Sequence, residues 1–174
     1  MDNTNTIIER NGFFSGGICQ YISVDEIISG AEVKHDLLYI PNTKNYNNLF
    51  KALKQVKDKE IIFECNKEVN IEKLLNECPK REDCFPIIDY IKYKISDEDA
   101  FAVSDISNLR MDDIVYCELK TESEYELWRR LAEEYTNCSF ELSLTGMENI
   151  HNVYNKLMSE KFSITSRTRI LLFK

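Results

Sequence analysis

Apolar residues in the first half of the chain follow strand-like and helix-like spacing in turn. The run at 37–40 ends before Pro41 and predicts a strand, and 60–65 predicts a second strand. Between them, apolar residues recur every three or four positions from 46 to 56, which is typical of a helix with one apolar face. The pattern also predicts an entry strand at 13–22, a helical turn at 24–29 closed by Gly30, a short helix at 71–78 and a long alternating strand at 85–95.

The second half shows the same order of elements. Alternation predicts strands at 114–119 and 140–144, and helical spacing predicts a helix between them that ends near 135. That helix begins at a capping box from Thr121 to Glu124, in which both side chains satisfy free backbone amides. A further helix at 147–160 and an alternating strand at 162–172 complete this half.

The two halves align at an offset of 77 residues (113 − 36). At this offset Asp36–Tyr39 meets Asp113–Tyr116, and the pair Phe63-Glu64 meets Phe140-Glu141. The strands and helices recur in the same order, and the alternating faces keep their parity. We therefore predict an internal duplication; the alternative is two unrelated α/β halves of similar rhythm.

These patterns lead us to expect an α+β fold of two pseudo-symmetric modules. Each module is a strand–helix–strand–strand unit whose long helix packs on an antiparallel sheet. The expected boundaries are an N-terminal extension with the entry strand at 1–30, a first module at 31–97 and a second module at 98–174, which together form one compact domain.

Composition narrows the classes of function. The net charge of −8 argues against direct binding of nucleic acid, which needs clustered Lys and Arg. No apolar stretch reaches the length of a membrane span, so we expect no membrane partner. The six cysteines form no C-x-x-C pair, and no secretion signal precedes them, so we expect reduced core cysteines in a cytoplasmic protein. His35 and His151 fit no zinc spacing, so we expect no metal site.

Motifs of catalysis and of cofactor binding are missing. The nearest approach to a phosphate loop, Ser15-Gly16-Gly17, lacks the lysine and the helix that should follow. No serine lies in a nucleophile elbow, and the two histidines offer no evident triad. We therefore expect no enzyme and no cofactor, although two carboxylates on facing strands could perform acid–base chemistry.

Two carboxylates, Glu64 and Glu141, each follow a phenylalanine in the strand after a long helix. Alternation turns the Phe and the Glu to opposite faces of the sheet. Each Glu is either a solvated carboxylate on an open face or a groove residue that selects a cationic ligand. Tyr39, Tyr93 and Tyr116 lie on predicted strands, where they either join the core or line that groove.

Of the two carboxylates, we expect Glu141 to be the ligand residue. Trp128 lies in the helix just before it, as either a core residue or a binding platform, and no cation follows in sequence until Lys156. Glu64 instead has Lys67 close by in sequence, which can neutralise it at the surface. A carboxylate without a local counter-charge is the better candidate for a binding site.

The second half resembles the GyrI-like effector-binding domains, including those at the C-terminus of MerR-type multidrug regulators. The stretches that carry the resemblance are 106–117, the helix through Trp128, Phe140-Glu-Leu142 and 169–172. The resemblance implies two strand–helix–strand–strand modules with a ligand groove at their pseudo-two-fold axis. It also implies that Glu141, in the strand after the second helix, contacts a cationic ligand. The apparent full helix at 147–160 departs from that family, where a shorter link is usual.

Two functions follow as hypotheses. The first is a non-enzymatic binding domain for a small, hydrophobic and cationic ligand, such as the effector domain of a transcriptional regulator. The second is an acidic inhibitor or immunity-type protein that binds a basic protein partner, which the net charge of −8 favours.

Overall fold

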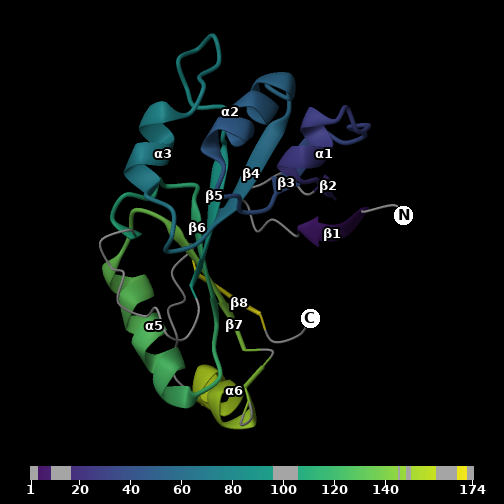
Figure 1. Cartoon of the computed structure of the whole chain (residues 1–174). Coiled ribbons are helices and arrows are strands. Elements are labelled where there is room, and N and C mark those ends of the chain that lie inside the picture. The colour runs from purple at the N-terminus through teal and green to yellow at the C-terminus, as the bar shows by residue number, and fades with distance from the viewer. Residues whose placement is uncertain are drawn as a thin grey trace. The chain divides into compact units, whose positions relative to one another are not determined.

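The computed structural model describes residues 4–8, 17–95, 106–144, 146–147, 150–159 and 168–171. The chain divides into two compact units, residues 1–92 and residues 93–174, and each is described by itself (Figure 1). No helix within the described residues is long and apolar enough to cross a membrane.

Unit 1 contains a sheet in which the strands lie side by side in chain order. Strand β1 (Thr4–Ile8) is antiparallel to β2 (Gly17–Tyr21), whereas β2, β3 (Leu37–Ile40) and β4 (Glu60–Cys65) run parallel. The connections are the helices α1 (Val24–Ile28) and α2 (Tyr46–Gln55), and α3 (Ile71–Glu77) follows β4. Strand β5 (Tyr90–Ile95) lies next to β4 and runs across the division between the units.

Unit 2 repeats the alternation of strand and helix. Strands β6 (Ile114–Glu118), β7 (Ser139–Ser143) and β8 (Thr168–Leu171) are parallel neighbours. Helix α5 (Glu122–Glu134) connects the first two strands, and α6 (Ile150–Ser159) precedes β8. The predicted capping box is present: Thr121 accepts from the amide of Glu124, and the Glu124 carboxylate accepts from the amide of Thr121.

The prediction of antiparallel strand–helix–strand–strand modules is wrong. The β2–β3, β3–β4, β6–β7 and β7–β8 ladders are all parallel, so the fold is of the α/β kind. The physical reason is that a helix lies between successive strands, and a helical crossover returns the chain to the end of the sheet where the previous strand began. The sequence pattern already showed this alternation of short strands with helices, including the helices predicted at 71–78 and 147–160.

Helices α1 and α2 contact each other. Since parallel crossovers are nearly always right-handed and the strands follow chain order, both helices lie on the same face of the sheet. The strand residues that face this side are fully buried, as are the inward positions of α2. They are Leu38, Ile40, Ile61, Phe63, Leu49, Ala52 and Leu53, each 0 % exposed.

The predicted long strand at 85–95 is wrong in its first half. Only 90–95 forms a strand, while Phe85 is 68 % exposed and precedes Pro86, which has no amide to donate. Ile87 and Ile88 are both buried, so the alternation that a strand needs is broken there. The stretch 106–117, which resembles the long strand that enters the second GyrI-like module, forms a strand only from Ile114 onward. The predicted positions 13–16, 148–149, 160, 162–167 and 172 lie outside the described residues.

The predicted core position is confirmed for five of the six cysteines. None of the six forms a disulfide, and Cys19, Cys65, Cys78, Cys117 and Cys138 are buried. Cys84 is exposed, and its φ of 68° is the left-handed conformation that glycine usually adopts. It lies in the loop that replaced the first half of the predicted strand, so its surroundings differ from those of the other five.

Candidate functional site

The face of the unit 1 sheet opposite α1 and α2 carries aromatic and acidic side chains. The ladder register places Tyr21 beside Tyr39 and Tyr39 beside Ile62, and side chains two residues apart on a strand share a face. Glu60 and Glu64 therefore join the same face as Ile62. Tyr39, Glu60 and Glu64 are half-buried, and Tyr21 is 45 % exposed.

Tyr39 and Glu64 form the closest polar pair on this face. The Tyr39 hydroxyl donates a hydrogen bond to Glu64 Oε2, which joins β3 to β4. Burial and, after it, the Glu64 carboxylate raise the pKa of Tyr39 above its usual range. The phenol therefore keeps its proton at neutral pH and holds the carboxylate oxygen in place. On the other side, the Tyr21 ring stacks on the Tyr39 ring, with centroids 5.3 Å apart and planes inclined at 17°.

A second tyrosine–glutamate pair lies further along the same face. The Tyr90 hydroxyl donates to Glu60 Oε1 at 2.7 Å. Between the two pairs is an apolar cluster of Cys19, Leu37 and Ile62, against which Tyr39 and Tyr90 pack. We call Tyr21, Tyr39, Glu64, Glu60 and Tyr90, with this cluster, the tyrosine–glutamate face. It combines aromatic rings, oriented carboxylates and an apolar centre.

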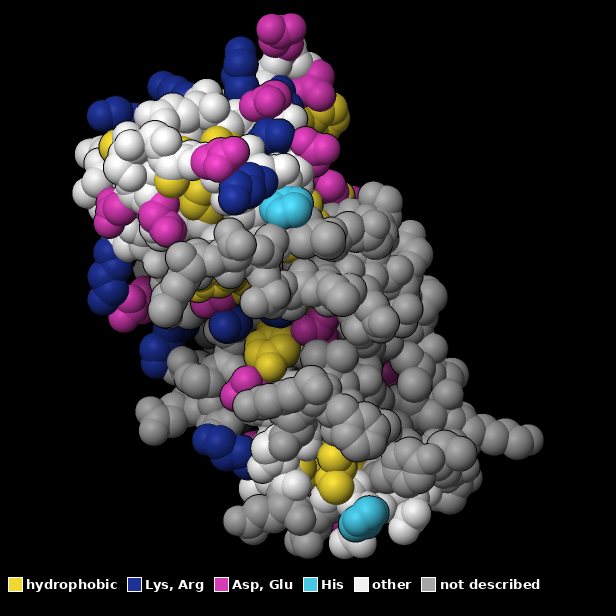
Figure 2. Space-filling model, turned by 90° about the vertical axis from the view of Figure 1, so that its right-hand side faces the viewer, with side chains coloured by type: hydrophobic (Ala, Val, Ile, Leu, Met, Phe, Trp, Pro, Cys, Tyr) yellow, Lys and Arg dark blue, Asp and Glu magenta, His cyan; other side chains and the backbone are white. Residues whose placement is uncertain are grey.

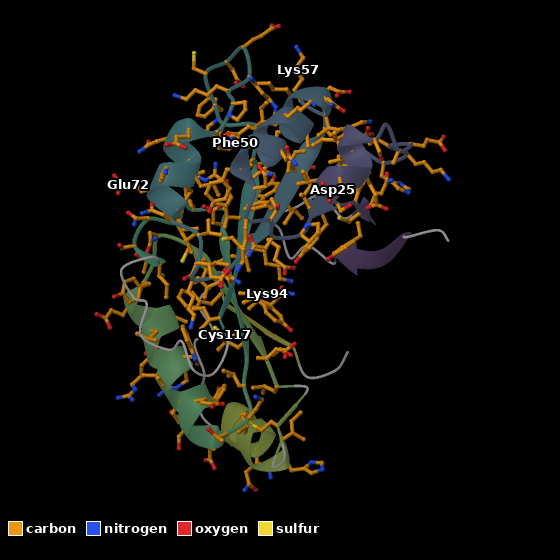
Figure 3. The ribbon with its side chains drawn as sticks, in the orientation of Figure 1. Asp25, Phe50, Lys57, Glu72, Lys94 and Cys117 are labelled. Atoms are coloured by element: carbon orange, nitrogen blue, oxygen red, sulfur yellow. The ribbon has the colours of Figure 1, made fainter. Side chains whose placement is uncertain are left out.

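In unit 2, Tyr116 occupies the position on β6 that Tyr39 has on β3. Its hydroxyl donates to Glu118 Oε1 at 3.1 Å, and Lys94 Nζ lies 5.9 Å from its ring centroid. Lys94, on β5, is labelled in Figure 3. Burial is the main cause that raises the pKa of Tyr116, and a hydrogen bond with Ser143 opposes that rise. The cation over this ring distinguishes Tyr116 from Tyr39, which has Tyr21 over it instead.

The predicted equivalence of Glu64 and Glu141 is wrong in register. The amide of Glu60 donates to the Asp36 carbonyl, and the amide of Ser139 donates to the Asp113 carbonyl. The second strand thus starts 24 residues after Asp36 (60 − 36) but 26 residues after Asp113 (139 − 113). Two extra residues leave the face unchanged but move the pairing along the strand. Tyr39 accordingly bonds Glu64, whereas Tyr116 bonds Ser143.

Glu141 has a basic residue as one of its Cα partners in the ladders. Its Cα partners are Tyr116 on β6 and Arg169 on β8. Arg169 is distant from Glu141 in sequence but adjacent to it in register, so a search for basic residues near Glu141 in sequence did not find it. This placement weakens the reason for preferring Glu141 over Glu64.

Of the six side chains predicted for a binding site, two lie in the core. Trp128 on α5 is 4 % exposed, and Tyr93 on β5 is 1 % exposed. The sequence left a core position or a binding position open for Trp128 and Tyr93, and both side chains lie in the core. The other four, Tyr39, Glu64, Tyr116 and Glu141, are half-buried on strands, with Tyr39 and Glu64 brought together in unit 1 and Tyr116 and Glu141 paired in unit 2.

Sequence reasoning missed Tyr21, Glu60, Tyr90 and Lys94. The signal was present in the strand parity: Glu60 and Glu64 flank Ile62 at spacings of two, and Tyr90 and Lys94 alternate with the buried Ile91. The partners themselves come from neighbouring strands, so only the ladder register reveals the pairs.

The chemistry of the tyrosine–glutamate face suits a positively charged group. Tyrosine rings attract cations over their faces, and a partly desolvated carboxylate adds a counter-charge. Within the described part of the chain, no cluster of three or more His, Cys, Asp or Glu side chains could hold a metal ion. Comparison with protein-family models, curated proteins and solved structures found no match.

Proposed function

We propose that this chain is a non-enzymatic binding protein for a hydrophobic, cationic ligand, and that the tyrosine–glutamate face of unit 1 takes the positive charge. The observation that carries the proposal is the Tyr39–Glu64 hydrogen bond beneath the stacked and exposed ring of Tyr21. An oriented carboxylate beside an accessible aromatic ring supplies both contacts that an organic cation needs.

The magnitudes of the two expected interactions favour a cationic ligand over a neutral one. A cation over an aromatic ring gains ~0.5–1 kcal/mol at an exposed site and ~2 kcal/mol where water is excluded. The Glu64 carboxylate adds a coulombic attraction for the positive charge, which is stronger where water is partly excluded. Tyr39 fixes the Glu64 carboxylate before binding, so less conformational freedom is lost when the ligand arrives.

The proposal keeps the ligand class of the GyrI-like effector domains and changes the residue that meets it. The parallel sheet differs from the antiparallel modules of that resemblance, so the position of Glu141 carries less weight. We assign the ligand contact to Glu64 instead, because Glu64 accepts a hydrogen bond from Tyr39 and the exposed ring of Tyr21 stacks on Tyr39.

Calorimetric titration with tetraphenylphosphonium tests this function, with tetraphenylborate as an anion of the same shape. We expect the cation to bind and the anion to bind at least tenfold more weakly. Glu64→Gln keeps an acceptor for the Tyr39 hydroxyl and removes the charge, so it should weaken cation binding about tenfold, or ~1.4 kcal/mol.

The matched control is Glu72→Gln, because Glu72 is an exposed carboxylate on α3 of the same unit (Figure 3). It also removes one negative charge and should leave the affinity unchanged. Equal binding of anion and cation would show that apolar contact alone governs binding, and equal losses in the two variants would show that general charge does. Either result would contradict binding of the positive charge at the tyrosine–glutamate face.

A further inference from the structure

The loop between α3 and β5 is a short, closed hairpin. Lys80 and Pro86 form an antiparallel bridge, and the Ile87 amide donates to the Pro79 carbonyl at 2.9 Å. Inside this bridge the Arg81 amide donates to the Phe85 carbonyl at 2.8 Å, and the Cys84 amide donates to the Arg81 carbonyl at 3.0 Å. The loop is the projection at the top of Figure 1, and its tip is residues 82–85.

Arg81 anchors this hairpin to the rest of unit 1. Its guanidinium donates to both Asp89 carboxylate oxygens, at 2.7 and 2.9 Å, and to the carbonyls of Lys57 at 3.0 Å and Lys59 at 2.8 Å. The Asp89 carboxylate also accepts from the Ile61 amide at 2.8 Å, which ties the loop to β4. Asp89 raises the pKa of Arg81, so the guanidinium stays charged. The loop is therefore held in one conformation before any partner arrives.

The four tip residues face solvent. Glu82, Asp83 and Cys84 are exposed, and Phe85 is 68 % exposed. A single exposed apolar residue is ordinary on a protein surface. The difference here is that the backbone beneath Phe85 is fixed at both ends and its conformation includes a left-handed Cys84. Acidic, basic and apolar side chains appear together at this end of unit 1 in Figure 2.

From this geometry we propose that the tip, residues 82–85, docks onto a second protein. The partner presents an apolar pocket that receives the Phe85 ring, bordered by Lys and Arg side chains that meet Glu82 and Asp83. A preorganised aromatic residue is the typical anchor of such an interface, since it buries much area and loses little freedom. This inference is independent of cation binding at the tyrosine–glutamate face.

Charge selects a basic protein over the other occupants. A second copy of this chain carries the same net charge of −8, so the acidic tip would meet a repulsive surface. An anionic lipid surface repels Glu82 and Asp83 in the same way. A basic protein gains from both carboxylates and attracts the acidic molecule at long range.

The exposed Cys84 allows a selective capture experiment. Because the other five cysteines are buried, a benzophenone maleimide attaches at Cys84, beside Phe85. The labelled chain is irradiated in an extract of its source cells. The control carries the same label through Cys84→Ser with Met111→Cys, since Met111 is another exposed apolar residue, at 56 %. We expect a basic protein that crosslinks from position 84 and not from position 111.

The captured protein is then purified, and its affinity is measured with unlabelled variants. We expect Phe85→Ala to weaken binding at least tenfold, and Glu82→Gln with Asp83→Asn to weaken it and to reduce its dependence on salt. Met111→Ala should bind as the wild type does, and all variants should keep their binding of tetraphenylphosphonium. Absence of a crosslink specific to position 84, or unchanged affinity in Phe85→Ala, would overturn the docking proposal.

Discussion

At the scale of single residues, Tyr39 shows how packing and charge together define a site. Its ring lies between Tyr21 and the apolar cluster, so burial favours the neutral phenol. Its hydroxyl bonds Glu64, and the carboxylate favours the neutral phenol further. One side chain therefore stabilises the sheet and orients the carboxylate that we assign to the ligand.

The Tyr39 hydroxyl predicts a loss of stability at alkaline pH. Its pKa is higher in the folded chain than the value of about 10 in the unfolded chain. The stabilisation is therefore complete below about pH 10 and is lost as pH rises above it. Urea unfolding should show Tyr39→Phe less stable than wild type by ~1.5 kcal/mol at pH 7, because a hydrogen bond to a charged group is lost. That difference should shrink by pH 10.5; a constant difference would contradict the assignment.

At the scale of elements, the sequence predicted those strands and caps whose signals are local. The strands at 37–40 and 60–65 and the capping box at Thr121 were predicted from local residues alone, because their signals lie within a few positions. The prediction of a strand at 85–95 was wrong in its first half because the hydrogen bonds between Arg81 and Asp89 close a loop there. Arg81 also donates to the carbonyls of Lys57 and Lys59 in a distant segment, and local spacing cannot reveal such partners.

Helix α5 provides a test at this scale. Thr121 accepts a hydrogen bond from the Glu124 amide at 3.2 Å and so satisfies one of the free amides of the first turn. Thr121→Ala should lower the free energy of unfolding by ~1 kcal/mol, whereas Thr121→Ser should retain most of it. Urea denaturation followed by circular dichroism measures both. Equal stability of the alanine and serine variants would mean that this cap does not stabilise the helix.

At the scale of the whole molecule, the order of strands and helices was readable and the direction of the strands was misread. A strand–helix–strand–helix–strand order recurs in both units, and that order alone favours parallel pairing. We predicted antiparallel pairing instead because the second half resembles a family of antiparallel modules. The pairing of Tyr39 with Glu64 and of Glu141 with Tyr116 depends on loop length, since two extra residues shift the register. Such a shift leaves no mark in the hydrophobic pattern.

The most direct test of the central claim is nuclear magnetic resonance of the ring-labelled tyrosines during titration with tetraphenylphosphonium. The account predicts saturable shifts for Tyr21 and Tyr39, which share one stacked pair on the tyrosine–glutamate face. Tyr116, beside Glu141 and beneath Lys94, should not shift at the same concentrations. Shifts confined to Tyr116, or no saturable shift at Tyr21 and Tyr39, would contradict cation binding at the tyrosine–glutamate face.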